Sequence, residues 1–262
     1  MQVWDGLTDA RIEFDWAGSV IPSSTTTVPT TIATMIENQN LTTALLNYLS
    51  SLGGIATFSP ARVDNIELGS ETDALDLSSW PVVTLSSGQT LAARLLVGAD
   101  GANSPVRTFA GIPSRGWDYN RNGVVATLQL ENTGRGGNEH KIAYQRFLAT
   151  GPVAMLPLPG NMASLVWSTT PERAAKLKSL QGEDFVAMVN AAFRLSKADL
   201  QYLHTMDQGQ KEEVEWRLQH TPRKEEKCPV RVVAVQEGSV APFPLKMRHA
   251  DTYIGERVAL VG

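Results

Sequence analysis

The segment 95–107, LLVGADGANSPVR, constrains the fold of this chain more than any other stretch. Its continuously apolar start is typical of a strand that is covered on both faces. Gly98 then permits tight backbone geometry, and Gly101 leaves room for a ligand against the main chain. The segment therefore predicts a buried strand that ends in a tight turn around Asp100.

A helix should begin directly after this turn. Asn103 or Ser104 can cap it, and Pro105 suits its first position. A helix that begins at the carboxyl end of a strand faces the crevice where open α/β sheets bind nucleotides. There Asp100 could accept hydrogen bonds from ligand hydroxyls, and Arg107 could pair with Asp100 or approach a phosphate. The residues alone fit a plain strand-to-helix turn with an Asp cap equally well, so both interpretations stay open.

Hydrophobic periodicity predicts helices and strands along the rest of the chain. Strands are expected close to the N-terminus and at 62–68, 82–85, 91–97, 124–130, 142–148, 153–156, 164–168 and 258–261. A Ser/Thr/Pro-rich surface connection at 23–31 precedes a helix that Asn40 caps and Gly53-Gly54 ends. Further helices are expected at 171–180 and 183–193, and a solvated charged helix and loop at 211–227. The Gly/Pro punctuation between the strands from 124 to 168 is typical of an antiparallel sheet.

Charge and cysteine content exclude several classes of protein. The net charge is −4 with both signs interspersed, so we expect no nucleic-acid partner. The single cysteine, Cys228, cannot form an internal disulfide, and no Cys/His cluster has zinc spacing, so no metal site is expected. No apolar run reaches the roughly 18 residues of a membrane-spanning helix, and the N-terminus does not read as a signal peptide.

No set of residues suggests acid/base or nucleophilic catalysis. The four histidines are scattered, without a carboxylate or cysteine at a related spacing, and we expect surface or hydrogen-bonded roles for them. Ser104 is not part of a GxSxG motif and is better explained as a helix cap. We therefore predict no catalytic side chain.

Several segments together resemble a known family. GADGANSPVR resembles the second flavin fingerprint of the class A flavoprotein monooxygenases, in which Asp-Gly lies beside FAD. A longer series resembles the ubiquinone-biosynthesis hydroxylases, in particular the eukaryotic mitochondrial members; its segments are MQVWD, ENQNLTTAL, LLVGADGANSPVR, WDYNRNGVVATLQLE, YQRFLATGPVAMLPLP, SLVWST and RVALVG. The resemblance implies an α/β fold, with an incomplete Rossmann-like FAD-binding part interleaved with an antiparallel β-sheet substrate domain. It places substrate-domain strands at 1–31, the FAD-binding part at 32–113, the substrate domain at 114–249 and a return to the FAD-binding part at 250–262.

The sequence also departs from the family pattern. The family's opening strand, GxGxxG motif and helix are missing, and the nearest match, GRGGNE at 134–139, is expected to be a hairpin loop. The third fingerprint continues past VALVG in the family, whereas this sequence stops at Gly262. We therefore expect a fragment, truncated at both ends, that does not retain FAD by itself.

For the complete enzyme, the resemblance implies FAD-dependent hydroxylation of the aromatic ring of a polyprenylated phenol, with electrons from NAD(P)H or a ferredoxin. The implied cofactor-binding residues are Gly98, Asp100, Gly101, Arg107 and Gly262. The implied substrate-binding residues are Arg146, Phe147, Gly151, Pro152, Met155, Phe243, Pro244 and Leu245. Ordinary core packing explains Phe147 and Met155 as simply.

The resemblance further implies a place in the cell and a set of partners. These are the matrix side of the mitochondrial inner membrane, peripheral membrane contact and other ubiquinone-biosynthesis proteins. Two alternatives remain. The Asp-Gly fingerprint also fits another flavin-dependent hydroxylase of the phenol or kynurenine type, and a chain that keeps only the substrate sheet could be a non-catalytic binding or scaffold subunit.

Overall fold

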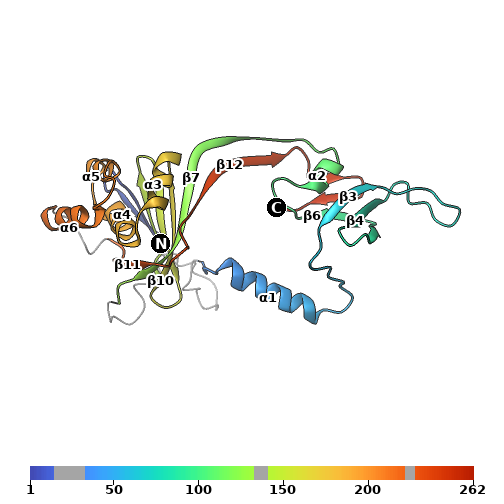
Figure 1. The fold of residues 1–262 in the computed structure, drawn as a ribbon, viewed down its shortest axis with the longest axis horizontal. Helices are drawn as coiled ribbons and strands as arrows, with labels where there is room; N and C mark the ends of the chain where they lie inside the picture. Colours follow the sequence, from blue (N-terminus) through green and yellow to red (C-terminus); the bar gives the residue numbers. More distant parts are fainter. Residues whose placement is uncertain (15–32, 133–140, 222–227) are drawn as a thin grey trace, which may run out of the picture. The chain divides into compact units, whose positions relative to one another are not determined.

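The computed structural model describes residues 1–14, 33–132, 141–221 and 228–262 (Figure 1). The predicted surface connection at 23–31 and the predicted hairpin loop at 134–139 lie outside the described residues. The chain divides into two compact units. Unit 1 comprises Met1–Thr43 and Asn120–Leu245, and unit 2 comprises Ala44–Tyr119 and Lys246–Gly262.

The core of unit 1 is built on a sheet whose strands follow the order β11-β7-β10-β9-β8-β1-β2, with β12 also paired to β7. The strands are β1 (Gln2–Asp5), β2 (Arg11–Glu13), β7 (Ser114–Leu130), β8 (Tyr144–Leu148), β9 (Gly151–Leu158), β10 (Met162–Thr169), β11 (Val232–Val235) and β12 (Ala241–Ala250). The pairs from β8 through β9 and β10 to β7 are antiparallel, as predicted, but β1 pairs with β8 in parallel. The sheet is therefore mixed. A parallel pair needs a long connection, and the many residues between β1 and β8 in the sequence provide it.

Four helices cover one face of this sheet, and Figure 1 shows them gathered on one side of β7 and β10. They are α3 (Pro171–Ser179), α4 (Gly182–Arg194), α5 (Lys197–Leu203) and α6 (Gln210–His220). Local sequence explains their starts: the Thr170 side chain caps α3, and Ser196 and Asp199 form a capping box for α5. The helices predicted at 171–180 and 183–193 are confirmed as α3 and α4.

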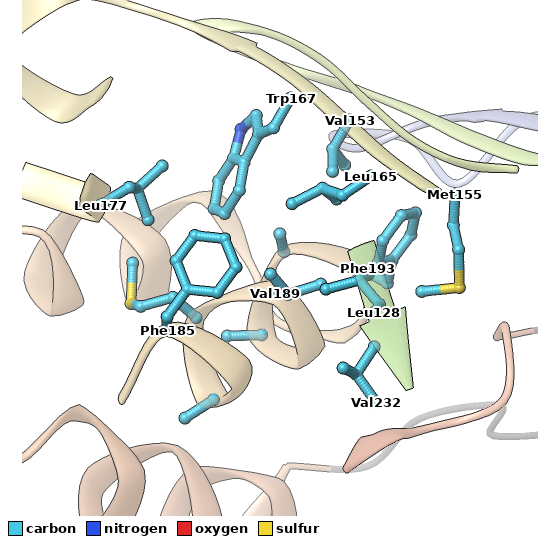
Figure 2. Close-up of a cluster of buried hydrophobic side chains, with 14 of the residues drawn as sticks. Leu128, Val153, Met155, Leu165, Trp167, Leu177, Phe185, Val189, Phe193 and Val232 are labelled. Carbon is cyan, nitrogen blue, oxygen red and sulfur yellow. The ribbon is translucent and has the colours of Figure 1, made fainter. Parts of the chain in front are cut away.

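The main core lies between this sheet face and the helices. Every second residue of β10 is buried, ending with Leu165, Trp167 and Thr169, as expected for a strand with one covered face. Figure 2 shows Trp167 and Leu165 packed against Phe185 and Phe193 of α4. Burial of such a side chain stabilises a fold by about 1.5–3 kcal/mol, so the packing of α4 on β10 contributes strongly to the stability of unit 1.

Unit 2 contains two small sheets. One is antiparallel and joins β3 (Val63–Leu68), β4 (Pro81–Leu85) and β5 (Thr90–Ala92). The other has the order β13-β14-β6 and joins β13 (Ile254–Gly255), β14 (Val258–Leu260) and β6 (Leu96–Gly98). The short helix α2 (Pro105–Phe109) follows β6. The predicted strands at 62–68, 82–85 and 258–261 are thus present.

One prediction about burial is wrong, and one predicted helix lies on the surface. The strand expected at 91–97 is split between β5 and β6, and Leu95 and Val97 are 58% and 49% exposed instead of covered on both faces. Helix α1 (Asn38–Ser51) forms where a helix was predicted, but it begins before the predicted cap, so that Asn40 lies in its first turn, and none of its residues is buried. An apolar pattern indicates which residues are suited to burial, whereas actual burial needs a second packed layer, and the described residues place none over these faces. No described helix combines the length and hydrophobicity needed to cross a membrane.

Candidate functional site

The turn between β6 and α2 is built as the sequence predicts. Ser104 caps α2, since its Oγ accepts the backbone N–H of Arg107 at 2.9 Å, and Pro105 occupies the first helical position. Asp100 Oδ2 accepts the backbone N–H of Val106 at 3.2 Å. Two side chains therefore satisfy amides that a helix start leaves without partners inside the helix.

The carboxylate of Asp100 remains available to a ligand. Partial burial acts to raise the pKa of Asp100, but hydrogen bonds to the Ser104 side chain and the Val106 backbone outweigh this effect and lower the pKa below its usual value. The side chain is exposed and stays ionised at neutral pH. An ionised carboxylate that lies beside a helix start is a strong acceptor for a hydroxyl group.

The two glycines of this turn have different roles. A Cβ atom at Gly98 would lie 2.8 Å from Cβ of Val106 and 3.1 Å from Cδ2 of Leu260, so only glycine lets α2 pack this closely on β6. Gly101 has a φ of +84°, and nothing lies within 4 Å of the position of its missing Cβ. The turn therefore combines close packing on one side with open backbone on the other.

The end of the chain meets this turn. Strand β14 runs parallel to β6, with Leu260 opposite Gly98, and Val261 N donates to Gly98 O at 2.8 Å. The carboxyl ends of two parallel strands thus bring Gly262 to the edge where Asp100 and Gly101 lie. An ionised acceptor and open backbone at this edge fit a cofactor that carries hydroxyl groups, as FAD does.

The side chain of Arg107 reaches the loop at the end of α2. Its Nη1 donates to the carbonyl of Ile112 at 3.1 Å, in the loop that follows α2. The charge of Arg107 still contributes to lowering the pKa of Asp100, but no hydrogen bond joins the two side chains in the described residues. Because α2 is one short helix, a long side chain in its middle reaches the C-terminal end as easily as the start.

The predicted substrate residues of β8 and β9 divide between the two faces of the sheet. Arg146 is buried on the helix-covered face, where its Nη1 donates to the carbonyls of Ala192 at 2.8 Å and Leu195 at 2.9 Å. Met155 is 3% exposed and belongs to the core on the same face. Strand alternation explains both positions, since their nearest neighbours along the strands point the other way.

Phe147 and Pro152 are brought together on the opposite face of the sheet. They are direct neighbours in the pairing of β8 with β9, and Phe147 is 47% exposed. Gly151 has a φ of +141°, and a Cβ there would clash with the carbonyl of Ser168, so the start of β9 needs glycine.

The residues predicted on β12 lie beside another glycine. A Cβ at Gly123 would lie 3.0 Å from Cζ of Phe243 and 3.4 Å from Cδ2 of Leu245. Pro244 lies between them in the strand and is exposed. The eight predicted substrate residues therefore do not form one cluster.

Sequence reasoning missed one group of polar side chains. Trp167, Arg173 and His204 line a small cavity in unit 1. Burial lowers the pKa of His204 to about 4, and the charges of Arg173 and Lys176 act in the same direction. The expected surface or hydrogen-bonded role does not describe its Nδ1, which is buried and has no hydrogen-bond partner in residues 1–14, 33–132, 141–221 and 228–262. In the part of the chain that the structure describes, no three His, Cys, Asp or Glu side chains gather as metal ligands.

Comparison with known sequences places these features in context. The model of the FAD binding domain family matches residues 22–262. A mitochondrial ubiquinone biosynthesis monooxygenase of Saccharomyces cerevisiae is 43% identical over 247 residues, which cover 87% of this chain and 50% of the relative. A protein of the same description from Homo sapiens is 34% identical over 263 residues, which cover all of this chain and 53% of the relative. The chain spans about half the length of the curated relatives it matches.

Two solved structures of flavin-dependent enzymes have a fold similar to that of this chain. The flavin-dependent halogenase CmlS has a TM-score of 0.57 at 15% identity, covering all of this chain and 40% of its own. The p-nitrophenol 4-monooxygenase PnpA of Pseudomonas putida has a TM-score of 0.50 at 14% identity, covering 86% of this chain and 46% of its own.

Proposed function

Because this chain belongs to the FAD binding domain family, we propose that it forms part of an FAD-dependent monooxygenase that hydroxylates the aromatic ring of a polyprenylated phenol in ubiquinone biosynthesis. The observation that carries the proposal is the turn around Asp100 and Gly101, next to the parallel strand β14 that ends at Leu260, in a chain 43% identical to a ubiquinone biosynthesis monooxygenase.

The residues of this turn would hold FAD by complementary means. Asp100 accepts a hydrogen bond from a cofactor hydroxyl, and Gly101 lets the cofactor approach the main chain. Gly98 and Gly262 support the same edge, while Arg107 acts indirectly by fixing the loop at Ile112. When bound and reduced by NAD(P)H or a ferredoxin, FAD supplies the oxygen activation from which the ring receives its hydroxyl.

The face of the unit 1 sheet that lies opposite the helices would bind the ring. Phe147 and Pro152 offer a flat apolar surface there, and Gly151 shapes the turn beside it. We add Phe243, Pro244 and Leu245 of β12 as further apolar wall. These groups orient the ring and exclude water and need not transfer a proton. Arg146 and Met155 support the sheet from the covered face.

We infer the cellular location of the protein from the descriptions of its relatives. The relatives are described as mitochondrial, which favours a mitochondrial protein. A polyprenylated substrate resides in the bilayer, so we propose peripheral contact with the matrix side of the inner membrane. Other ubiquinone-biosynthesis proteins would be its partners.

A chimaera tests this function. The stretch of the Saccharomyces cerevisiae relative that matches this chain is replaced by residues 1–262, and the hybrid is expressed in yeast that lacks the relative. We expect a yellow, FAD-containing protein and recovery of ubiquinone in lipid extracts. The readouts are flavin absorbance of the purified hybrid and chromatography of the quinones.

The outcomes separate the alternatives. A hybrid that holds FAD and hydroxylates only soluble phenols would indicate a phenol or kynurenine-type hydroxylase. A hybrid that folds without FAD and restores no quinone would favour a binding or scaffold role and overturn the proposal. The same hybrid with Arg62→Gln, an exposed substitution far from the turn in sequence, controls for expression.

A further inference from the structure

A small cavity lies inside unit 1, away from the features used above. It opens between the turn after β1, the turn between β8 and β9, strand β10 and helices α3 and α5. Its volume is about 30 Å³, enough for about two water molecules. The cavity is on the helix-covered face, because Trp167 of β10 lines it and belongs to the covered core. Phe147 and Pro152 are on the opposite face.

Two residues that line this cavity each have a buried nitrogen atom without a hydrogen-bond partner among the described residues. Trp167 is 1% exposed, and its indole Nε1 donates to no group. Figure 2 shows the indole ring beside the core cluster of Phe185 and Leu177. His204 Nδ1 is also unpartnered, and the two rings lie 6.0 Å apart between centroids. A buried N–H without a partner destabilises the fold, so a ligand atom that accepts a hydrogen bond from it binds favourably.

The charge at this cavity is positive and unbalanced. Arg173 lines it, and its side chain makes one hydrogen bond within the described residues, a long one of 3.5 Å from Nη1 to Thr150 Oγ1. Burial lowers the pKa of Arg173, as expected where no carboxylate pairs with it in the described residues. Lys197 also lines the cavity, which has no Asp or Glu in its wall. His204 is neutral at pH 7, since its pKa is about 4, so it removes none of this charge.

We propose that this cavity binds the carboxylate group of a short-chain monocarboxylate, with Arg173 and the indole N–H of Trp167 as donors. Water could fill the volume, but it carries no charge to balance Arg173. A carboxylate has two oxygen atoms, which suits a space for two water molecules, whereas phosphate brings four. The two carboxylate oxygens fill this volume, so the short aliphatic end would extend out of the cavity toward the exposed side chain of Leu7.

Nitrogen-15 NMR of the tryptophan indoles of the 262-residue chain tests this site. The chain has six tryptophans, and the Trp167 signal is identified from its loss in Trp167→Phe. Should that variant not fold, the contact with the His204 ring identifies the signal through a nuclear Overhauser effect. Sodium propionate is titrated at pH 7 against sodium chloride and sodium phosphate of equal ionic strength. We expect a saturable downfield shift of the Trp167 N–H with propionate alone, at millimolar concentrations.

Variants at Arg173 test whether its positive charge contributes to propionate binding. Arg173→Gln should weaken propionate binding at least about tenfold, the loss expected for a hydrogen bond to a charged group. Arg173→Lys should retain part of the affinity, and Arg62→Gln, which removes one exposed charge elsewhere, should change nothing. Folding of each variant is checked by its remaining indole signals. Absence of a shift, a shift of equal size with chloride, or propionate binding that survives in Arg173→Gln overturns the proposal and leaves ordinary water as the occupant.

Discussion

Single residues at the strand-to-helix turn have two tasks at once. Asp100 accepts a hydrogen bond from the backbone N–H of Val106 at the start of α2 and also presents a negative charge to a ligand. Asp100→Asn keeps an oxygen for the Val106 N–H but removes the charge. We expect FAD binding to the yeast hybrid to weaken about 10- to 100-fold, since a hydrogen bond to a charged group contributes about 1.5–3 kcal/mol. Flavin fluorescence titration measures this change, and unchanged affinity would contradict the role of Asp100.

The low pKa of His204 predicts that unit 1 becomes less stable in acid. Its pKa is about 4 in the folded chain and 6.5 in the unfolded chain, so between these values only the unfolded chain binds the proton. Stability from this group is complete above pH 6.5 and falls as the pH drops toward 4, by about 2 kcal/mol at pH 5. Arg173, Lys176 and Lys197 are the charged groups around it.

Substitution separates this effect from other titrations. His204→Gln should lose less stability than the parent chain between pH 7.5 and pH 5, measured by urea unfolding with tryptophan fluorescence. His249→Gln, at an exposed position, should follow the parent. Equal pH dependence in the parent and His204→Gln would disprove the prediction.

At the scale of elements, α2 depends on Gly98. A Cβ there would meet Cβ of Val106 at 2.8 Å, and both positions are buried. Gly98→Ala should therefore destabilise the packing of α2 on β6 by about 1–3 kcal/mol. Gly53→Ala, where nothing lies within 4 Å, is the matched control and should cost little. Amide hydrogen exchange of the peptide 96–109 reports the difference, and equal exchange in the two variants would refute it.

The end of α4 depends on Arg146. Its guanidinium donates to the carbonyl of Ala192, in the last turn of the helix, and to that of Leu195, at the C-cap. Arg146→Met leaves these buried carbonyls without a donor, and we expect a loss of about 2–4 kcal/mol in the free energy of unfolding of unit 1. Arg62→Met, at a side chain that is 82% exposed, should stay within about 0.5 kcal/mol of the parent. A small loss in Arg146→Met, measured by urea unfolding, would show that the cap is not needed.

For the whole molecule, burial predicts two levels of stability. The main core cluster belongs to unit 1, whereas unit 2 buries few apolar side chains, among them Val83, Leu85 and Val258. Amides of β10 and α4 should therefore exchange with solvent at least about 100-fold more slowly than those of β6 and α1. Exchange mass spectrometry of the 262-residue chain measures both sets, and similar protection would contradict the prediction.

Local patterns in the sequence were enough for many features. Ser104 and Pro105 are adjacent to the helix that they start, so the cap could be predicted without knowledge of any distant contact. The same holds for the strands at 63–68, 81–85 and 162–169 and for helices α3 and α4, whose periodicity is carried by consecutive residues. The flavin fingerprint is likewise a short continuous motif, which is why the family could be identified from the residues alone.

Only the tertiary structure decided which face each side chain occupies and what lies against it. Arg146 and Phe147 are neighbours in sequence, yet one caps a buried helix and the other is exposed, because the sheet has helices on one face. Trp167, Arg173 and His204 come from three elements, and only the packing of α3 and α5 on β10 makes them one cavity. Sequence fixes local conformation through short-range sterics and hydrogen bonds, whereas burial and charge balance depend on contacts between residues that are distant along the chain.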